Sequence, residues 1–253
     1  MVIYSHSKLS VYEQCPFKFK LKYIDRIEPD IKQFIEGFLG NQIHLALEFL
    51  YKEASNNRLI ELDDLIKYFA ENWKKNFNQD IKINKEMNSD DYFIQGVKFL
   101  INYYTRNYPF DDNTIALEKE ILIKLDEQGK YLLRGFIDRL VHNKELNIIE
   151  IHDYKTSGAL KTQEELDNDR QLALYCLGIQ QEFNANDVHL IWHFLDFDKR
   201  FVSKRTTEQL EELKKQLIIL IDEIESCQEF HPKTGKLCDW CEFKISCPHK
   251  IKF

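Results

Sequence analysis

Two carboxylates and one ammonium are spaced along the chain in a way that suits phosphodiester chemistry. Asp153 and Lys155 lie two residues apart in an apolar run, and Asp138 lies in the run before it. Because side chains alternate along a strand, Asp153 and Lys155 point the same way, and a hairpin would place Asp138 beside them. Carboxylates bind Mg²⁺, which polarises a phosphate and acidifies water, and an ammonium can stabilise phosphate charge. The competing interpretation, an exposed Asp–Lys pair, is disfavoured by the apolar run and by Asp138.

Three of the six cysteines lie within ten residues, as Cys238-x2-Cys241-x5-Cys247. A tight turn brings the first two sulfurs together, and a soft metal usually takes four such ligands. The fourth ligand stays open at this point. Its candidates are Cys15, His231 and His249.

The elements that must position these residues follow from hydrophobic spacing and turn residues. Helices are predicted at 8–14 (with Ser7 as the N-cap), 36–55, 62–77, 90–108, 164–183 and 206–227. Strands are predicted at 114–125, 131–141, 147–155 and 187–198. Turns at 126–129 and 143–145 join the first three strands into a meander. This order indicates an α/β domain with a central mixed β-sheet flanked by helices.

Composition and charge narrow the class of protein. The chain has 253 residues, enough for one large domain, and no apolar run approaches the ~18 residues that span a bilayer. The first residues lack a secretory pattern, so we expect a cytoplasmic protein with reduced cysteines, of which Cys176 and Cys227 are buried core residues. The net charge of −7 opposes nucleic-acid binding. However, residues 1–35 have a net charge of +2 and residues 233–253 a net charge of +3, so a basic face forms if the two ends meet.

Four short motifs follow one another along the chain. They are Gly40-x3-His44, Gly135-Phe136-Ile137-Asp138, Asp153-Tyr154-Lys155 and Gln171-x3-Tyr175. Together they resemble the RecB-like branch of the PD-(D/E)xK nuclease superfamily. Tyr12-x2-Cys15-Pro16 and the three C-terminal cysteines are similar to the subset with a four-cysteine iron–sulfur cluster, which includes AddB-type nucleases and the RecB-like exonuclease of CRISPR adaptation. The chain departs from the founding motifs modestly, with Ile137 in place of proline and an aspartate, Asp153, in place of glutamate.

The resemblance implies a role for each matching residue. The metal ligands for Mg²⁺ or Mn²⁺ would be His44, Asp138, Asp153 and the Tyr154 carbonyl. Lys155 would be the catalytic lysine, which Gln171 and Tyr175 would position together with the nucleic-acid backbone. A [4Fe–4S] cluster would be held by Cys15, Cys238, Cys241 and Cys247.

The resemblance also implies an architecture and an activity. We expect a restriction-endonuclease-like core forming a single domain over 1–253. Residues 51–113 would be a helical insertion, and 1–25 with 228–253 would form a cluster-binding subdomain. The activity would be a metal-dependent DNA nuclease, foremost a single-strand exonuclease in DNA repair, recombination or CRISPR adaptation. The partners would be DNA and a helicase or CRISPR-adaptation protein, since the sequence has no P-loop pattern.

Two other functions stay open at the level of sequence. One is a non-catalytic nucleic-acid-binding adaptor that keeps the fold, which the intact set of His44, Asp138, Asp153 and Lys155 disfavours. The other is a hydrolase with a structural zinc ion, for which His231 or His249 is the fourth zinc ligand. If single strands are bound, bases could stack on N-terminal aromatic residues, although core packing competes for them. These aromatic residues are Tyr12, Phe17, Phe19 and Tyr23.

Overall fold

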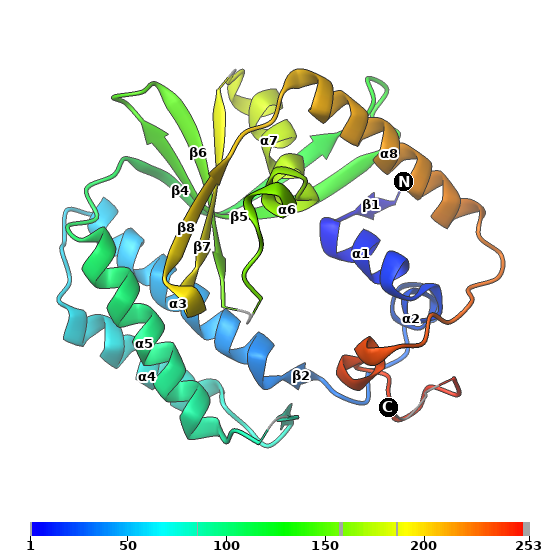
Figure 1. Ribbon diagram of the computed structural model, residues 1–253, viewed down its shortest axis with the longest axis horizontal. Helices are drawn as coiled ribbons and strands as arrows, with labels where there is room; N and C mark the ends of the chain where they lie inside the picture. The colour runs from blue at the N-terminus through cyan, green and yellow to red at the C-terminus, as the bar shows by residue number, and fades with distance from the viewer. Residues whose placement is uncertain (1, 85, 157–158, 186, 250–253) are drawn as a thin grey trace.

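At the centre of the computed structural model, which describes residues 2–84, 86–156, 159–185 and 187–249, is a six-stranded mixed sheet (Figure 1). Its strands are β1 (Ile3–Tyr4), β4 (Thr114–Lys124), β5 (Leu132–Asn143), β6 (Ile148–Lys155), β7 (Val188–Phe194) and β8 (Lys199–Ser203). The β4–β5, β5–β6 and β7–β8 pairs are antiparallel, whereas β6 pairs parallel with β7. The short β1 pairs parallel with the first residues of β5. The predicted mixed α/β class is confirmed.

One face of the sheet is covered by helices from both ends of the chain. They are α1 (His6–Gln14), α6 (Gln163–Asp167), α7 (Arg170–Phe183) and α8 (Thr207–Ser226). The side chains of α7 and α8 share one apolar core with β4–β7. The hydroxyl of Ser5 accepts a hydrogen bond from the Lys8 amide, so the cap of α1 is Ser5 and the predicted cap at Ser7 was wrong.

The opposite face carries a second core built by three helices. They are α3 (Ile35–Ser55), α4 (Leu62–Asn76) and α5 (Ser89–Asn107). Tyr154 of β6 and Leu195, just after β7, belong to the same core. A small parallel pair, β2 (Gln33–Phe34) with β3 (Ile81–Lys82), joins the start of α3 to the segment between α4 and α5. Residues 51–113 therefore include most of the layer that covers this face.

Two predicted elements differ from the structure for local reasons. The helix predicted at 164–183 is divided into α6 and α7, because the carboxylate of Asp169 caps a new helix by accepting the amides of Gln171 and Leu172. The strand predicted at 187–198 ends at Phe194. A 3-10 turn (Leu195–Phe197) and Asp198, with φ of 48°, reverse the chain into the edge strand β8, which the sequence pattern did not reveal.

The C-terminal segment that follows α8 lies beside α2 (Pro16–Phe19) of the N-terminal segment (Figure 1). Glu242 pairs with Lys18 and Lys22, and its carbonyl accepts a hydrogen bond from the Ile31 amide at 3.1 Å. The Asp30 carboxylate accepts the amides of residues 245 and 246. The basic terminal segments thus share one region of the surface. None of the helices in the described ranges is long and apolar enough to cross a bilayer.

Candidate active site

The motif residues meet where β5 and β6 pass α3. His44 projects from the first half of α3, and its Nε2 lies 3.0 Å from the Tyr154 carbonyl oxygen at the end of β6. The Asp138 carboxylate on β5 accepts a hydrogen bond from the Tyr154 amide at 2.9 Å. The backbone N–H and C=O of one residue, Tyr154, therefore help to orient Asp138 and His44 toward each other.

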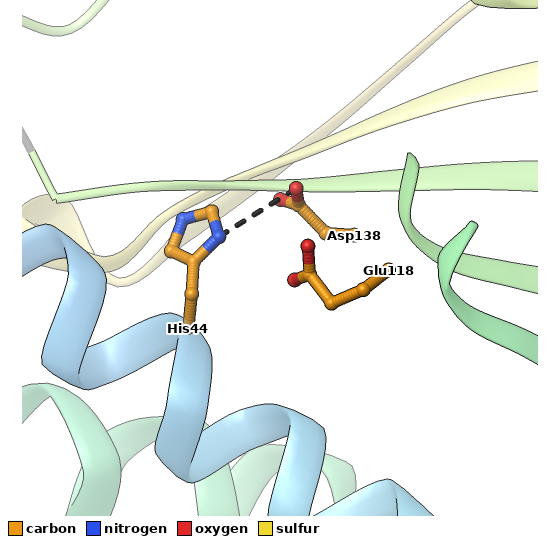
Figure 2. Close-up of side chains that lie close together, drawn as sticks. All are labelled: His44, Glu118 and Asp138. Atoms are coloured by element: carbon orange, nitrogen blue, oxygen red, sulfur yellow. Dashed lines mark ion pairs between the residues drawn. The ribbon is translucent and has the colours of Figure 1, made fainter. Parts of the chain in front are cut away.

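Three side chains form a compact group of donors at this point (Figure 2). Each of His44, Glu118 and Asp138 offers one atom, and these atoms lie within 4.8 Å of one another. The His44 Nδ1 atom is 3.5 Å from an Asp138 oxygen. One imidazole and two carboxylates are ligands that suit a divalent cation such as Mg²⁺ or Mn²⁺. Of the predicted ligands, His44 and Asp138 belong to this group and Glu118 completes it, whereas Asp153 lies outside it and pairs with Lys155. The three residues present fit a divalent cation.

The electrostatics of this group also favour a cation. Burial, reinforced by the charge of Asp153, raises the pKa of Asp138 well above its usual range, although the Tyr154 amide and Lys155 oppose the shift. Burial and then the charge of Asp138 raise the pKa of Glu118 to about 7. These carboxyl groups repel each other when both are ionised, so a bound divalent cation would relieve that repulsion.

Lys155 lies next to this group and is held from two sides. Its ammonium is 2.7 Å from an Asp153 oxygen and donates a hydrogen bond to Gln171 Oε1 at 2.9 Å. Gln171 in turn donates to the Tyr175 hydroxyl at 3.3 Å, one turn along α7. Burial disfavours the charged ammonium, but Asp153 and Asp138 outweigh it and raise the pKa of Lys155. The lysine is therefore a fixed positive charge at neutral pH.

Two glycines of the motifs allow close approaches that build the site. A Cβ atom at Gly135 would lie 2.4 Å from the ring of Tyr175, so only a glycine lets this ring lie against β5. A Cβ atom at Gly40 would lie 3.1 Å from the Thr156 hydroxyl oxygen, where α3 passes the end of β6. Glycine at both positions lets the helices bring His44 and Gln171 to the strands.

Sequence reasoning missed Glu118. It lies on β4 between Leu117 and Lys119, which pair with Arg139 and Ile137, so it stands opposite Asp138. Its φ of 45° departs from strand geometry. A regular alternation of strand side chains therefore gives no reliable direction for Glu118. The only available signal was a run of three consecutive charged residues, Glu118, Lys119 and Glu120, in the predicted strand 114–125.

The cysteines of the two ends line a single pocket. Cys15, Cys238, Cys241 and Cys247 all contribute to it, together with His249, whose ring packs against Phe17. Within the described ranges, no three cysteine sulfurs lie as close together as the donors around His44. His231 pairs with Glu229 and is exposed. Cys176 is buried as predicted, whereas Cys227 is only partly buried at the edge of the core.

The fold and this site define a class of protein: an α/β domain with acidic residues and a lysine converging at a mixed sheet. The sequence model of the PD-(D/E)XK nuclease superfamily matches residues 3–248, so the chain belongs to that superfamily. Its members are nucleases that use divalent metals, and the group at His44 is the candidate metal site.

Comparison with curated proteins gives no match. Among solved structures, the one described as "Crystal structure of SSO0001" aligns over 97% of this chain and 96% of that chain. The identity is 15% and the TM-score is 0.41, a likeness too distant to carry an argument about this chain.

Proposed function

We propose that this chain is a Mg²⁺- or Mn²⁺-dependent deoxyribonuclease that degrades single-stranded DNA from an end. One observation carries the proposal: a partly buried ammonium, Lys155, is held beside a compact group of metal-ligand side chains on the adjoining strands and helix. A purely structural role would not require two carboxyl groups with raised pKa values next to that ammonium. The preference for single strands and ends rests on the resemblance to RecB-like exonucleases.

Each residue then has a task in phosphodiester hydrolysis. His44, Glu118 and Asp138 would hold a cation, with Asp153 and the Tyr154 carbonyl at its margin. The cation, when bound, supplies positive charge that polarises the phosphate and acidifies water. The Lys155 ammonium stabilises the negative charge that develops on the phosphate, and Gln171 keeps it aimed. With a pKa of about 7, Glu118 can exchange a proton near neutral pH whenever it is not neutralised by the cation.

The direct experiment is digestion of end-labelled linear DNA, single- and double-stranded, with Mg²⁺, with Mn²⁺ and with EDTA. We expect metal-dependent loss of label from linear single strands and slower loss from duplexes. Covalently closed single-stranded circles serve as the matched control, because they have no end. Degradation of circles at the rate of linear strands would contradict the end-dependent part of the proposal. No cleavage of any DNA in either metal would leave the non-catalytic adaptor as the function.

The pocket at the joined ends supports a second part of the proposal: a structural [4Fe–4S] cluster held by Cys15, Cys238, Cys241 and Cys247. Four thiolates around a single zinc ion, with Zn–S bonds of about 2.3 Å, would have sulfurs about 3.8 Å apart. Among the residues that the structure describes, no three cysteine sulfurs all lie within 4.8 Å of one another. A cluster of four iron atoms is wider than one ion, so it suits this pocket better. His249, which lines the same pocket, would be the fourth ligand in the zinc alternative.

These features favour the RecB-like branch with an iron–sulfur cluster. In that arrangement residues 1–25 and 228–253 form one cluster-binding subdomain, and residues 51–113 supply helices to the second layer. The joined ends bring their basic residues to one region, which would attract the DNA backbone. A helicase or CRISPR-adaptation protein would supply DNA ends as a separate partner in the cytoplasm.

A further inference from the structure

A groove of about 530 Å³ lies between the start of α3 and the C-terminal segment. On one side it is lined by Phe34 and by the chain that leads to it. On the other side it is lined by Trp240, which closes the 3-10 turn at Lys236–Trp240. It is separate from the pocket at the four cysteines, although Phe243 borders both.

Two aromatic rings face each other across this groove. The ring centroids of Phe34 and Trp240 are 5.8 Å apart, and the planes are inclined by 57°. Trp240 is 39% exposed, whereas Trp73 and Trp192 are 8% and 0% exposed. An exposed indole beside a second ring offers a flat apolar surface, and flat apolar surfaces of this kind bind nucleobases by stacking.

The charges of the groove suit a polyanion. Three cationic side chains line it, Lys22, Arg26 and Lys32, against the single carboxylate of Glu242. Glu242 is itself occupied by ion pairs with Lys18 and Lys22, and Lys32 lies 3.5 Å from Asp80 at the surface. A local cationic excess in a chain of net charge −7 indicates a site for a negatively charged ligand.

The groove leads toward the candidate active site. Gly37 lines it, and His44 follows seven residues later on the same helix, about 10 Å along the axis of α3. That distance corresponds to about three stacked nucleotides at ~3.4 Å each. The N-terminus of α3 also lies at the groove, and Phe34, its N-cap residue, makes no side-chain capping hydrogen bond. The helix dipole favours a phosphate there, although the carboxylate of Glu36 in the first turn of α3 opposes it.

We infer that this groove binds single-stranded DNA next to the site of cleavage, with one base stacked on Trp240 and the backbone phosphates near Arg26 and Lys32. The inference rests on the proposed nuclease function and extends it to substrate recognition. Stacking on exposed bases selects single strands, because the bases of a duplex are not available to an indole. Of the four aromatic residues suggested by the sequence, Tyr12 and Phe19 are buried in the core, whereas Phe17 and Tyr23 are partly buried.

The test is binding of fluorescein-labelled oligo(dT) measured by anisotropy, in a Lys155→Ala background so that the probe is not cut. Trp240→Ala should weaken binding by at least about tenfold (about 1.4 kcal/mol), and Trp240→Phe should restore most of it. Phe197→Ala is the matched control, since Phe197 is 38% exposed and lies after β7, away from the groove. Arg26→Ala should weaken binding and lower the slope of log K against log salt by about 1.

Trp240 lies between two of the proposed cluster ligands, so its replacement could disturb the C-terminal segment. Phe34→Ala removes the neighbouring ring while leaving every residue of the C-terminal segment unchanged, and it should weaken binding as well. Iron content and melting temperature are measured for every variant. Binding within twofold of the parent for Phe34→Ala, Arg26→Ala and a folded Trp240→Ala would overturn the inference, as would equal weakening of a duplex probe by Trp240→Ala.

The binding measurement is interpreted independently of the cleavage assay. If the chain binds oligo(dT) through Trp240 but cleaves no DNA, the groove stands and the proposed nuclease function fails. If the chain cleaves DNA but the groove variants bind normally, the groove is wrong and the nuclease function stands.

Discussion

At the scale of single residues, the main result is the position of Glu118. It completes a group of donors with His44 and Asp138 that the ordered motifs alone do not contain. Glu118 stands opposite Asp138 across the β4–β5 pair, and after burial the charge of Asp138 contributes to the raised pKa of Glu118. Without a metal, the Glu118 carboxylate is repelled by Asp138, and a bound cation would remove that repulsion. Glu118 should therefore contribute to metal affinity.

Glu118→Gln should therefore weaken Mn²⁺ binding by roughly tenfold or more, because a charged ligand becomes a neutral one. Isothermal titration calorimetry with Mn²⁺ alone measures the effect without any activity assay. Glu120→Gln is the control, since Glu120 is two residues away on the same strand and pairs with Arg134 at the surface. Equal Mn²⁺ affinity of the Glu118→Gln variant and the wild type would remove Glu118 from the metal site.

At the scale of secondary-structure elements, β5, β6 and β7 are joined beneath α5 by a buried polar network. Arg139 donates to His152 Nδ1 at 2.9 Å, and His152 Nε2 lies 3.1 Å from a Glu150 oxygen. Because a guanidinium can only donate, Nδ1 of His152 must accept, and the ring is neutral with its proton on Nε2. His193 then donates from Nε2 to the same Nδ1 atom at 2.9 Å.

This network predicts a loss of stability in mild acid. Burial lowers the pKa of both His152 and His193 well below the usual value, and the charge of Arg139 adds to the shift. Below pH ~6.5 the unfolded chain takes up protons that the folded chain cannot. The contribution of these two histidines to the free energy of unfolding should therefore fall as pH falls through ~6.5, by up to about 1.4 kcal/mol per pH unit for each histidine. The raised pKa values of Glu118 and Asp138 act with the opposite sign, so the histidine contribution is obtained from the difference between variant and wild type.

Urea unfolding between pH 5 and 7.5 measures this slope. His193→Gln should reduce it, because one of the two buried titrating groups is gone. His231→Gln should leave it unchanged, since His231 is exposed near the C-terminal segment. An identical slope in His193→Gln and the wild type would contradict the assignment.

The secondary-structure elements also show which parts of the fold could be predicted from the sequence. The three long strands and the long helices follow from local periodicity, and so did the convergence of Asp153 and Lys155, which needs only alternation and one hairpin. The edge strand β8 was missed because charged Lys199 and Arg200 hide its pattern. β1, β2 and β3 have two residues each, too short for any period, and their pairing depends on contacts far apart in sequence.

The same reasoning explains the candidate site. His44, Gln171 and Tyr175 could be named only through the resemblance, because each is unremarkable on its own helix. Glu118 could not be named because its backbone leaves strand geometry. The groove at Trp240 joins residues more than 200 positions apart, and no local pattern predicts such a neighbourhood.

At the scale of the whole molecule, residues from 14–21 and 232–249 line one pocket that includes the four cysteines. A cluster with four thiolates there would cross-link a very long loop, so its loss should loosen both ends together. Cys15→Ser should thus behave like Cys247→Ser, with less iron, a lower melting temperature and weaker DNA binding. Cys176→Ser, at a buried thiol in α7, should keep full iron.

Metal analysis of the purified variants, with absorption near 400 nm, checks this prediction. It also separates the cluster from the zinc alternative, in which His249 is the fourth ligand and Cys15→Ser has no effect. A Cys15→Ser protein with full metal content and an unchanged melting temperature would show that no metal centre ties the ends together.

The central claim is that the site at Asp153 and Lys155 hydrolyses DNA, and single-turnover cleavage of end-labelled single-stranded DNA in Mg²⁺ or Mn²⁺ tests it most directly. Asp153→Ala and Lys155→Ala should each lower the rate by about 10³-fold or more, because metal positioning and charge stabilisation together supply several kcal/mol. Both variants should still bind the DNA, and Lys199→Ala, at an exposed lysine of β8, should cleave normally. Near wild-type cleavage by both Asp153→Ala and Lys155→Ala would contradict the account.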